Sequence, residues 1–429
     1  MLKSWRRRCR RKTGGMPELT IPSHFLCPIS LHLMKDPVTL STGTTYDRHS
    51  IETWIEAGNR TCPVTSQVLR DLEPIPNHAI RKNIQEWCVE NGSRGIERIP
   101  TPRIPITSTE VSEMLVRVSE ASDESRCREF VAKIKQSAKE SDRNKRCFVA
   151  NGSTKVLSAA FAAFSNADET VTVLAEILSA MITLTPVLDE ETSSNLSSEH
   201  PLQKLVWFLR FGSLSARRNA VLALRSILSF DQFKFEIVVK IEGMVEALIR
   251  LINEPICPTT TKASLLSIYY LLKPTENSKG IAITLTEMGL VEKLLEMAVD
   301  SDRSVCEKAL GVLDRMCSHG EVRERARGNA LMIPLLVKKV LRVSGMATEF
   351  SVSILLKIVR GDEGEEERAA AAVEALQAGA FQKLLLVLQI GSDEVSKEKV
   401  TELLKVMNGY RNRIECVDSL DFKHLRRPF

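Results

Sequence analysis

From about residue 110 almost to the C-terminus, apolar residues recur at the spacing of an α-helix. Six segments in this region share one pattern: a small or turn-forming residue comes first, and apolar residues follow three or four positions apart. These segments start at Gly152, His200, Gly243, Gly289, Ala330 and Gly379. Successive starts lie 41 to 49 residues apart, with further helical patterns between them. One such unit cannot bury its apolar face alone, so the pattern predicts stacked helical repeats.

The length of the period indicates the kind of repeat. A spacing of ~40–47 residues is typical of armadillo or HEAT repeats, which stack into a solenoid. We therefore expect an all-α armadillo-repeat superhelical solenoid over residues 110–429. Two polar, acidic stretches, 189–199 and 361–368, interrupt the helical pattern. We expect both to be solvated loops between helices.

The pattern changes in residues 20–94, where apolar segments are short and turn-forming residues are frequent. Two short strands, at 38–40 and 45–46, are predicted on either side of a Ser-Thr-Gly turn. Asp47 is placed to cap a helix that ends near Gly58, and Asn77 is placed to cap a second helix that ends near Gly92. These signals predict a small α+β domain ahead of the solenoid.

Residues 95–109 contain three prolines at alternating positions, which predicts a stiff, extended linker. Residues 1–19 are a basic segment followed by a loop. The whole chain carries a net charge of +5, whereas its first 15 residues carry +7, so the remainder is close to neutral. The basic segment has the composition of a nuclear localisation signal, a nucleic-acid contact or an anionic-membrane contact, and equally that of a solvated tail.

Composition supports a large, mostly helical protein. With 429 residues, the chain is long enough for two or more domains, and its low aromatic content of 5% favours packed helices. Its ten cysteines contain no Cys-x-x-Cys pair, which is typical of reduced thiols in a cytosolic protein, with a nuclear location also open. We expect no secretory signal, because no apolar core follows the basic start, and no apolar run reaches the ~18–20 residues needed to span a bilayer.

Cys27 and Cys62, each followed by proline, are the first candidates for chemistry. A structural zinc ion needs four closely placed ligands, usually in short-spaced Cys or His pairs. Only His24 and Cys27 have such a spacing here, so we expect no metal. A catalytic thiol needs a base nearby or a lowered pKa, whereas Cys27 lies in an apolar run. We interpret both cysteines as small, buried packing residues.

The motifs of the small domain, in their order along the chain, resemble the U-box, a RING-like domain without zinc. The residues that carry this resemblance are Cys27-Pro28-Ile29-Ser30, Met34-Lys35-Asp36-Pro37-Val38, Gly43, Tyr46-Asp47-Arg48, Ile51, Trp54, Cys62-Pro63-Val64-Thr65 and Pro76-Asn77-His78. A U-box followed by armadillo repeats is the layout of the plant U-box ubiquitin ligases. The phrase GIERIPTPRIP in the linker is similar to one branch of that family, which is linked to stress and immune signalling.

The resemblance implies a ligase that forms no covalent intermediate and has no catalytic nucleophile or cofactor. Such a ligase binds a ubiquitin-conjugating enzyme charged with ubiquitin and favours transfer to a substrate lysine through positioning. By resemblance, the docking groove uses Ile29 and Leu31 in a first loop, Trp54 on the helix, and Pro63 and Ser66 in a second loop. An exposed Trp is a frequent hot spot, although Trp54 could instead pack into the core.

The remaining residues of the motif are expected to build the domain itself. They are Cys27, Pro37, Val38, Tyr46, Asp47, Ile51 and Cys62. Polar groups, with Ser41, Thr42, Asp47, Glu52 and Thr65 as candidates, would replace the zinc ions. The resemblance further implies that the armadillo repeats recruit a protein substrate.

Ser66 departs from the family pattern, since many ligases place a basic or amide side chain there to grip both conjugating enzyme and ubiquitin. It leaves open a second interpretation, a non-catalytic armadillo scaffold with a pseudo-active U-box. A third, nucleic-acid binding, rests on the basic tail alone and is not expected. A nuclear-import carrier is disfavoured because Trp207 is the only tryptophan after Trp87. The sequence contains no phosphate loop and no Ser-His-Asp set. We therefore expect no small-molecule substrate.

Overall fold

The computed structural model describes residues 21–99, 106–121, 123–167, 170–230, 241–275, 277–361, 364–390 and 394–411. The basic tail and the middle of the linker lie outside these ranges. The chain forms two compact units that divide between Ile104 and Pro105. Each unit has its own hydrophobic core.

The N-terminal unit contains a three-stranded antiparallel sheet of order β2-β1-β3. Its strands are β1 (Pro37–Thr39), β2 (Thr45–Asp47) and β3 (Ile75–Pro76). The predicted turn between β1 and β2 is confirmed: Gly43 has φ +80°, and its N–H donates to the Leu40 carbonyl. The two-residue β3 was not predicted, because so short a strand gives no alternating pattern.

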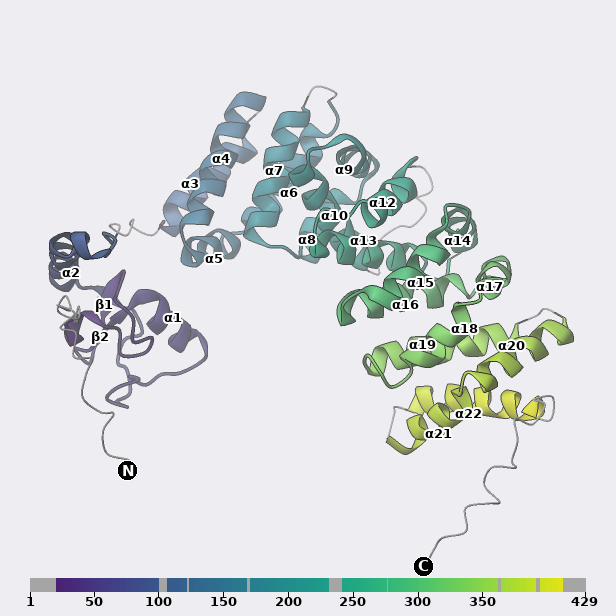
Figure 1. Cartoon of the computed structure of the whole chain (residues 1–429). Helices are drawn as coiled ribbons and strands as arrows, with labels where there is room; N and C mark the ends of the chain where they lie inside the picture. The colour runs from purple at the N-terminus through teal and green to yellow at the C-terminus, as the bar shows by residue number, and fades with distance from the viewer. Residues whose placement is uncertain are drawn as a thin grey trace, which may run out of the picture. The chain divides into compact units, whose positions relative to one another are not determined.

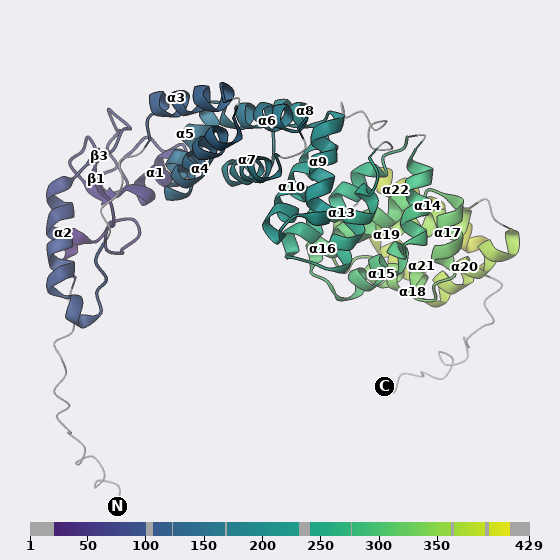
Figure 2. The same ribbon diagram turned by 90° about the horizontal axis from the view of Figure 1, so that it is seen from above.

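Two α-helices and two 3-10 turns complete the N-terminal unit: α1 (Arg48–Glu56), α2 (His78–Glu90), η1 (Ser23–Phe25) and η2 (Gly92–Arg94). The Asn77 side chain accepts a hydrogen bond from Ile80 N–H, which confirms it as the cap of α2. Helix α2 lies beside β1 (Figure 2). Ile99 is buried in the same core as Ile84 and Cys88 of α2. The chain therefore still packs on this unit at residue 99.

The repeat unit is organised around a row of helices, each packed on the next, which we call the inner ladder. Its members are α4 (Glu124–Glu140), α7 (Val171–Leu184), α10 (Leu214–Ser229), α13 (Pro258–Leu271), α16 (Arg303–Met316), α19 (Gly345–Arg360) and α22 (Glu394–Gly409). Figure 1 shows α16 and α19 at the inner edge of this unit and α14, α17 and α20 at its outer edge.

The other helices cover the inner ladder. One set precedes the ladder helices directly: α3 (Ser108–Ser119), α6 (Ser153–Phe164), α9 (Glu199–Phe211), α12 (Met244–Asn253), α15 (Leu290–Asp300), α18 (Met332–Lys339) and α21 (Ala380–Ile390). The remaining helices of the described ranges are α5 (Asp142–Ala150), α8 (Glu190–Leu196), α14 (Ser278–Glu287), α17 (Gly320–Arg327) and α20 (Glu365–Gln377).

Four of the six predicted repeat starts are glycines with a left-handed backbone. Gly152, Gly243, Gly289 and Gly379 have φ between +71° and +86°, and each stands directly before a helix. This conformation costs a residue with a Cβ about 1–2 kcal/mol, whereas glycine adopts it freely. The repeated small residue therefore marks a tight turn between two helices.

The prediction of solvated loops is wrong for most of the first acidic stretch and for residues 365–368 of the second, which are helical. Most of the first forms α8, in which Thr192, Ser193 and Leu196 are buried, and the second runs into the first turn of α20. Glutamates are favourable at these positions because the N-terminal end of a helix attracts negative charge. Within the described ranges, no single helix has the length and apolar character to cross a membrane; two bent helix pairs, 142–164 and 365–390, reach that length and apolar character only when their two helices are taken together.

Candidate functional site

The two Cys-Pro segments of the N-terminal unit form loops with the same hydrogen bonds. In the first loop, Cys27 N–H donates to the His32 carbonyl, and Leu31 N–H donates to the Cys27 carbonyl. In the second, Cys62 N–H donates to the Gln67 carbonyl, and Ser66 N–H donates to the Cys62 carbonyl. Single β-bridges, Leu26 with Leu33 and Thr61 with Val68, close the loops at equivalent places. We call residues 26–33 and 61–68 the twin loops.

The twin loops display apolar side chains to solvent. Ile29 is 38% exposed and Leu31 is 73% exposed in the first loop, and Val64 is 57% and Val68 73% exposed in the second. Val64 occupies the place in the second loop that Ile29 has in the first. Sequence reasoning did not place Val64 or Val68 in the docking groove, although the repeated Cys-Pro-(Ile/Val)-(Ser/Thr) pattern was a signal for Val64. Exposed apolar groups concentrated on two neighbouring loops are typical of a protein-binding surface.

Trp54 joins helix α1 to the second twin loop. Its indole N–H donates to the Thr61 carbonyl at 2.8 Å, directly before Cys62. The ring is half-buried against the core of the N-terminal unit. Trp54 therefore has features of both roles considered from the sequence, an exposed docking residue and a core residue. Part of its surface faces solvent, and its indole supports the loop that carries Pro63 and Ser66. Pro63 is half-buried, and Ser66 is exposed.

Cys27, Tyr46 and Cys62 are fully buried and hold the loops from inside. The Cys27 sulfur accepts the Asp47 N–H at 3.3 Å, while the Cys62 sulfur lies 3.0 Å from the Tyr46 hydroxyl, which also accepts the Val64 N–H. Burial would raise the pKa of Cys62, but hydrogen bonds from nearby hydroxyls, including that of Tyr46, lower the pKa to about 6. Burial would also raise the pKa of Cys27, but hydrogen bonds from backbone N–H groups lower this pKa below its ordinary value.

These contacts give both thiols a structural role. Each sulfur accepts or shares a hydrogen bond with groups from β2, so both twin loops are fastened to one strand. Pro37, Val38 and Ile51 are buried beside them, as expected for residues that build the domain.

An ionic bridge ties the segment between the first loop and β1 to both helices. The Asp36 carboxylate accepts Arg48 Nε of α1 at 2.6 Å and an Arg81 guanidinium N–H of α2 at 2.7 Å. All three side chains are at most 20% exposed. Breaking these two ion pairs therefore costs more stability than breaking a surface salt bridge. Sequence reasoning missed this role of Asp36 and Arg81, because they lie 45 residues apart.

Asp47 has a different role from the one predicted. It is the N-cap residue of α1, yet its side chain makes no capping hydrogen bond. The carboxylate instead accepts the N–H groups of Lys35 and Asp36 at 2.8 and 2.9 Å.

A second polar bridge uses Asn77, whose amide donates to the hydroxyls of Thr39 and Thr45. Among the described residues, no three His, Cys, Asp or Glu side chains group closely enough to hold a metal ion.

Tyr46→Phe tests the support of the second loop. The substitution removes the hydroxyl that contacts Cys62 Sγ and accepts Val64 N–H, and we expect it to lower the free energy of unfolding of the N-terminal unit by about 1–3 kcal/mol. Urea unfolding followed by tryptophan fluorescence measures this loss. Tyr270→Phe, in α13 of the repeat unit, is the matched control. A change below about 0.5 kcal/mol at Tyr46 would contradict this role.

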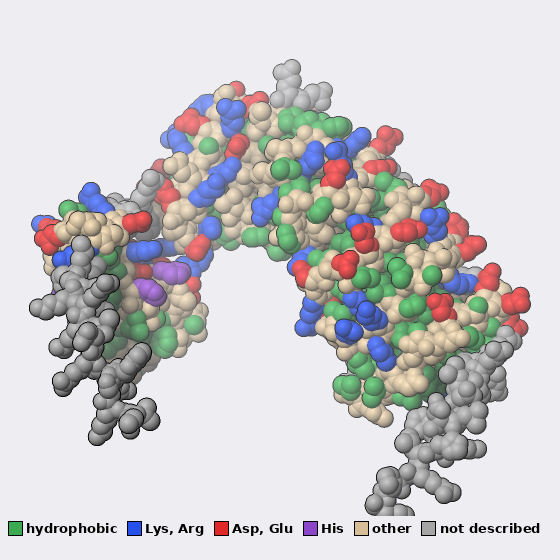
Figure 3. Space-filling model, in the orientation of Figure 1, with side chains coloured by type: hydrophobic (Ala, Val, Ile, Leu, Met, Phe, Trp, Pro, Cys, Tyr) green, Lys and Arg blue, Asp and Glu red, His purple; other side chains and the backbone are tan. Residues whose placement is uncertain are grey.

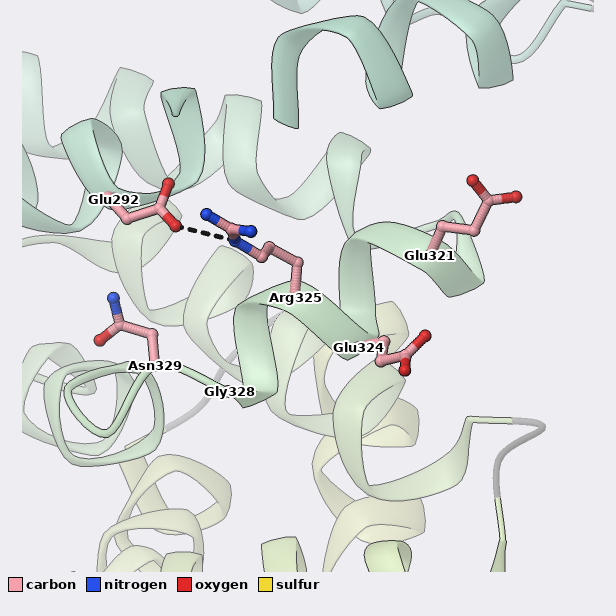
Figure 4. A pocket seen from close by; sticks show the side chains of 6 residues that line it. All are labelled: Glu292, Glu321, Glu324, Arg325, Gly328 and Asn329. Atoms are coloured by element: carbon pink, nitrogen blue, oxygen red, sulfur yellow. Dashed lines mark hydrogen bonds and ion pairs between the residues drawn. The ribbon is translucent and has the colours of Figure 1, made fainter. Parts of the chain in front are cut away.

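The repeat unit contains an open depression of about 450 Å³ at its outer side, lined by Glu292, Glu321, Glu324, Arg325, Gly328 and Asn329 (Figure 4). Arg325 Nε donates to the Glu292 carboxylate at 3.0 Å. This lining has no thiol, hydroxyl or imidazole, and one of its three carboxylates, that of Glu292, is paired with Arg325. The twin loops remain the better functional candidate.

Comparison with known proteins identifies both units. Residues 21–93 match the U-box domain, and residues 110–426 match the plant U-box protein ARM repeat region. The chain belongs to the plant U-box proteins with armadillo repeats. U-box domain-containing protein 21 of Arabidopsis thaliana is 45% identical, over 96% of this chain and 94% of the relative. E3 ubiquitin-protein ligase PUB23 of Arabidopsis thaliana is 35% identical, over 92% and 95%.

Family membership assigns the N-terminal unit as a U-box and the repeat unit as an armadillo solenoid. The predicted α+β domain followed by an all-α solenoid is thereby confirmed. The family includes proteins named as E3 ubiquitin-protein ligases. The twin loops, Asp36 and Trp54 all lie within the U-box.

Proposed function

We propose that this protein is an E3 ubiquitin ligase whose U-box binds a ubiquitin-charged conjugating enzyme on the twin loops. The exposed apolar side chains of Ile29, Leu31, Val64 and Val68 are the observation that carries this proposal. They form a surface that water solvates poorly, and a partner that covers it gains hydrophobic free energy. Trp54 contributes its exposed part and fixes the second loop.

The chemistry requires no nucleophile from the U-box. The thioester of the charged conjugating enzyme is the reactive group, and a substrate lysine attacks it. The U-box acts by holding the mobile conjugate in its reactive arrangement, which raises the effective concentration of aligned reactants. The armadillo repeats would recruit the substrate, and the similarity in the linker suggests stress or immune signalling.

A reconstituted ubiquitination reaction tests the proposal. The full chain is incubated with activating enzyme, ubiquitin, ATP-magnesium and a panel of conjugating enzymes, after prior dialysis against EDTA to remove tightly bound zinc. We expect chains on the ligase itself with at least one conjugating enzyme. No chains with any member of a broad panel would favour the non-catalytic scaffold.

Ser66 is the feature that favours the scaffold alternative. It is exposed at the end of the second loop with φ +58°, and its side chain is too short to bridge two bound proteins. We expect Ser66→Arg to speed ubiquitin transfer by about three- to tenfold, since a charge-assisted hydrogen bond contributes roughly 1 kcal/mol or more. Single-turnover discharge of the charged conjugating enzyme onto free lysine measures this rate.

Ser66→Gly is the matched control, because glycine adopts the same left-handed backbone freely and carries neither a cation nor an amide. An equal rate for wild type and Ser66→Arg would show that this position does not limit transfer.

A further inference from the structure

The inner ladder carries an excess of positive charge. Within α10, α13, α16 and α19, nine residues are Lys or Arg and three are Asp or Glu. Figure 3 shows Lys and Arg side chains gathered at the inner edge of the repeat unit over α16 and α19, while Asp and Glu side chains are frequent along the outer edge. An excess of one sign on one face attracts a ligand of the opposite sign.

The three acidic groups of these helices already have cationic partners. Glu307 accepts from Arg303, Asp314 pairs with Lys357 at 2.8 Å, and Glu349 pairs with Lys399 at 3.7 Å. Lys262 and Arg360 also pair with carboxylates, those of Asp302 and Glu402, so the excess charge lies on the other cations of these helices.

Several cations of the ladder contact only neutral groups within the described chain. Arg225 donates to the Pro186 carbonyl, and Lys308 donates to the backbone and side chain of Ser304. Arg315 stacks over the ring of Tyr269, with 3.8 Å between guanidinium carbon and ring centroid. One of its terminal nitrogens is buried and has no hydrogen-bond partner among the described residues, whereas the side chain as a whole is half-buried. A carboxylate beside the exposed part of this guanidinium would neutralise its charge.

Two aromatic rings meet beside this cation, over the centre of α16. Gly311 lies in the same helical row as Ser304, Lys308 and Arg315, which are half-buried, yet Gly311 itself is buried. A Cβ at Gly311 would lie 3.2 Å from the Phe350 ring and 3.6 Å from the Tyr269 ring. The rings of α13 and α19 therefore close over α16 at the position where it has no side chain.

Tyr269 and Phe350 are half-buried, so part of each ring offers an apolar surface next to the guanidinium of Arg315. We call Tyr269, Lys308, Gly311, Arg315 and Phe350 the ladder platform. An apolar surface flanked by cations fits a ligand that alternates apolar and anionic groups.

We propose that the ladder platform binds an acidic, extended peptide segment that places an apolar side chain on the Tyr269 and Phe350 rings and carboxylates at Lys308 and Arg315. The inference rests on the proposed function, because it names the substrate class that the repeats would present to the U-box. Nucleic acid fits less well, because the platform has only two cations, whereas a nucleic-acid strand is held by a groove of cations that follows its phosphate backbone.

Fluorescence anisotropy with the full chain tests the proposal. The probe is a fluorescein-labelled peptide of alternating Glu and Gly with one central Phe, and its counterpart has Lys in place of Glu. We expect the acidic probe to bind and the basic probe to fail. Raising the salt from about 50 mM to about 300 mM should weaken binding severalfold, because partly exposed charges are screened.

Variants locate the binding surface. We expect Lys308→Glu with Arg315→Glu to weaken the acidic probe at least about tenfold, since both charges turn repulsive. Arg315→Gln should weaken it less. Lys338→Glu makes the same kind of charge change on an exposed residue of α18, outside the ladder, and should leave affinity within about twofold. Circular dichroism melting shows whether each variant is folded.

Three outcomes would overturn the proposal. They are no binding of the acidic probe by the folded wild type, an equal loss in Lys338→Glu, and tighter binding of single-stranded DNA or of a peptide with phosphoserine in place of Glu. Self-ubiquitination by the same variants separates this inference from the proposed function. It should stay at the wild-type rate, because the ladder platform lies outside the U-box. Peptide binding without ligase activity would retain the platform and refute the ligase.

Discussion

Asp36→Ala is expected to destabilise the U-box strongly while the stability of the armadillo repeats is unchanged. The substitution leaves Arg48 and Arg81, both only 13% exposed, without their shared carboxylate. Losing one partner of a buried ion pair costs about 3–5 kcal/mol, and partial exposure reduces this to about 2–3 kcal/mol. A domain of this size rarely has more than about 3–5 kcal/mol of stability, so most of the margin disappears.

Urea unfolding, followed through tryptophan fluorescence and far-ultraviolet circular dichroism, resolves the two units. In Asp36→Ala we expect the transition of the U-box to move to much lower urea while the helical signal of the repeats is unchanged. Glu73→Ala removes a carboxylate from an exposed loop residue of the same domain and should behave as wild type. An unchanged U-box transition in Asp36→Ala would show that the ionic bridge is dispensable.

Leu31→Asn is expected to abolish productive docking of the conjugating enzyme without loss of stability. Leu31 is 73% exposed and lies outside the buried core, so its side chain contributes little to folding. Its φ of +57° is left-handed, and asparagine tolerates this conformation better than most residues. Losing an apolar anchor at the centre of an interface costs about 2 kcal/mol, which weakens binding roughly thirtyfold.

Calorimetric titration with a conjugating enzyme that supports self-ubiquitination measures this affinity. Val89→Gln is the matched control, since Val89 is an exposed apolar residue of α2 outside the twin loops. Equal affinities for Leu31→Asn and wild type would place the docking surface elsewhere. Trp54→Ala is a poorer test, because it also removes the hydrogen bond that supports Thr61 and the second loop.

The sequence predicted what depends on local pattern. The repeated starts at Gly152, Gly243, Gly289 and Gly379 are turns that need a left-handed backbone, and so they recur visibly with the repeat. Asn77 caps α2 as predicted, because a capping side chain needs only its own helix.

Contacts between distant residues could not be predicted in this way. Asp47 has the sequence position of a helix cap, but the N–H groups of Lys35 and Asp36 compete for its carboxylate. The contact of Asp36 with Arg81 depends on the packing of α2 against β1. Stretch 189–199 looks like a loop by composition, yet Leu196 packs into the core and draws it into α8. Tertiary packing overrides weak local preference in such cases.

The most direct test of the account is single-turnover discharge of a ubiquitin-charged conjugating enzyme onto free lysine, with EDTA present throughout. The wild-type chain is compared with Leu31→Asn and with a reaction that lacks ligase. We predict that the wild type accelerates discharge and that Leu31→Asn returns it close to the rate without ligase. No acceleration by the folded wild type, or equal acceleration by Leu31→Asn, would contradict a metal-independent ligase that acts through the twin loops.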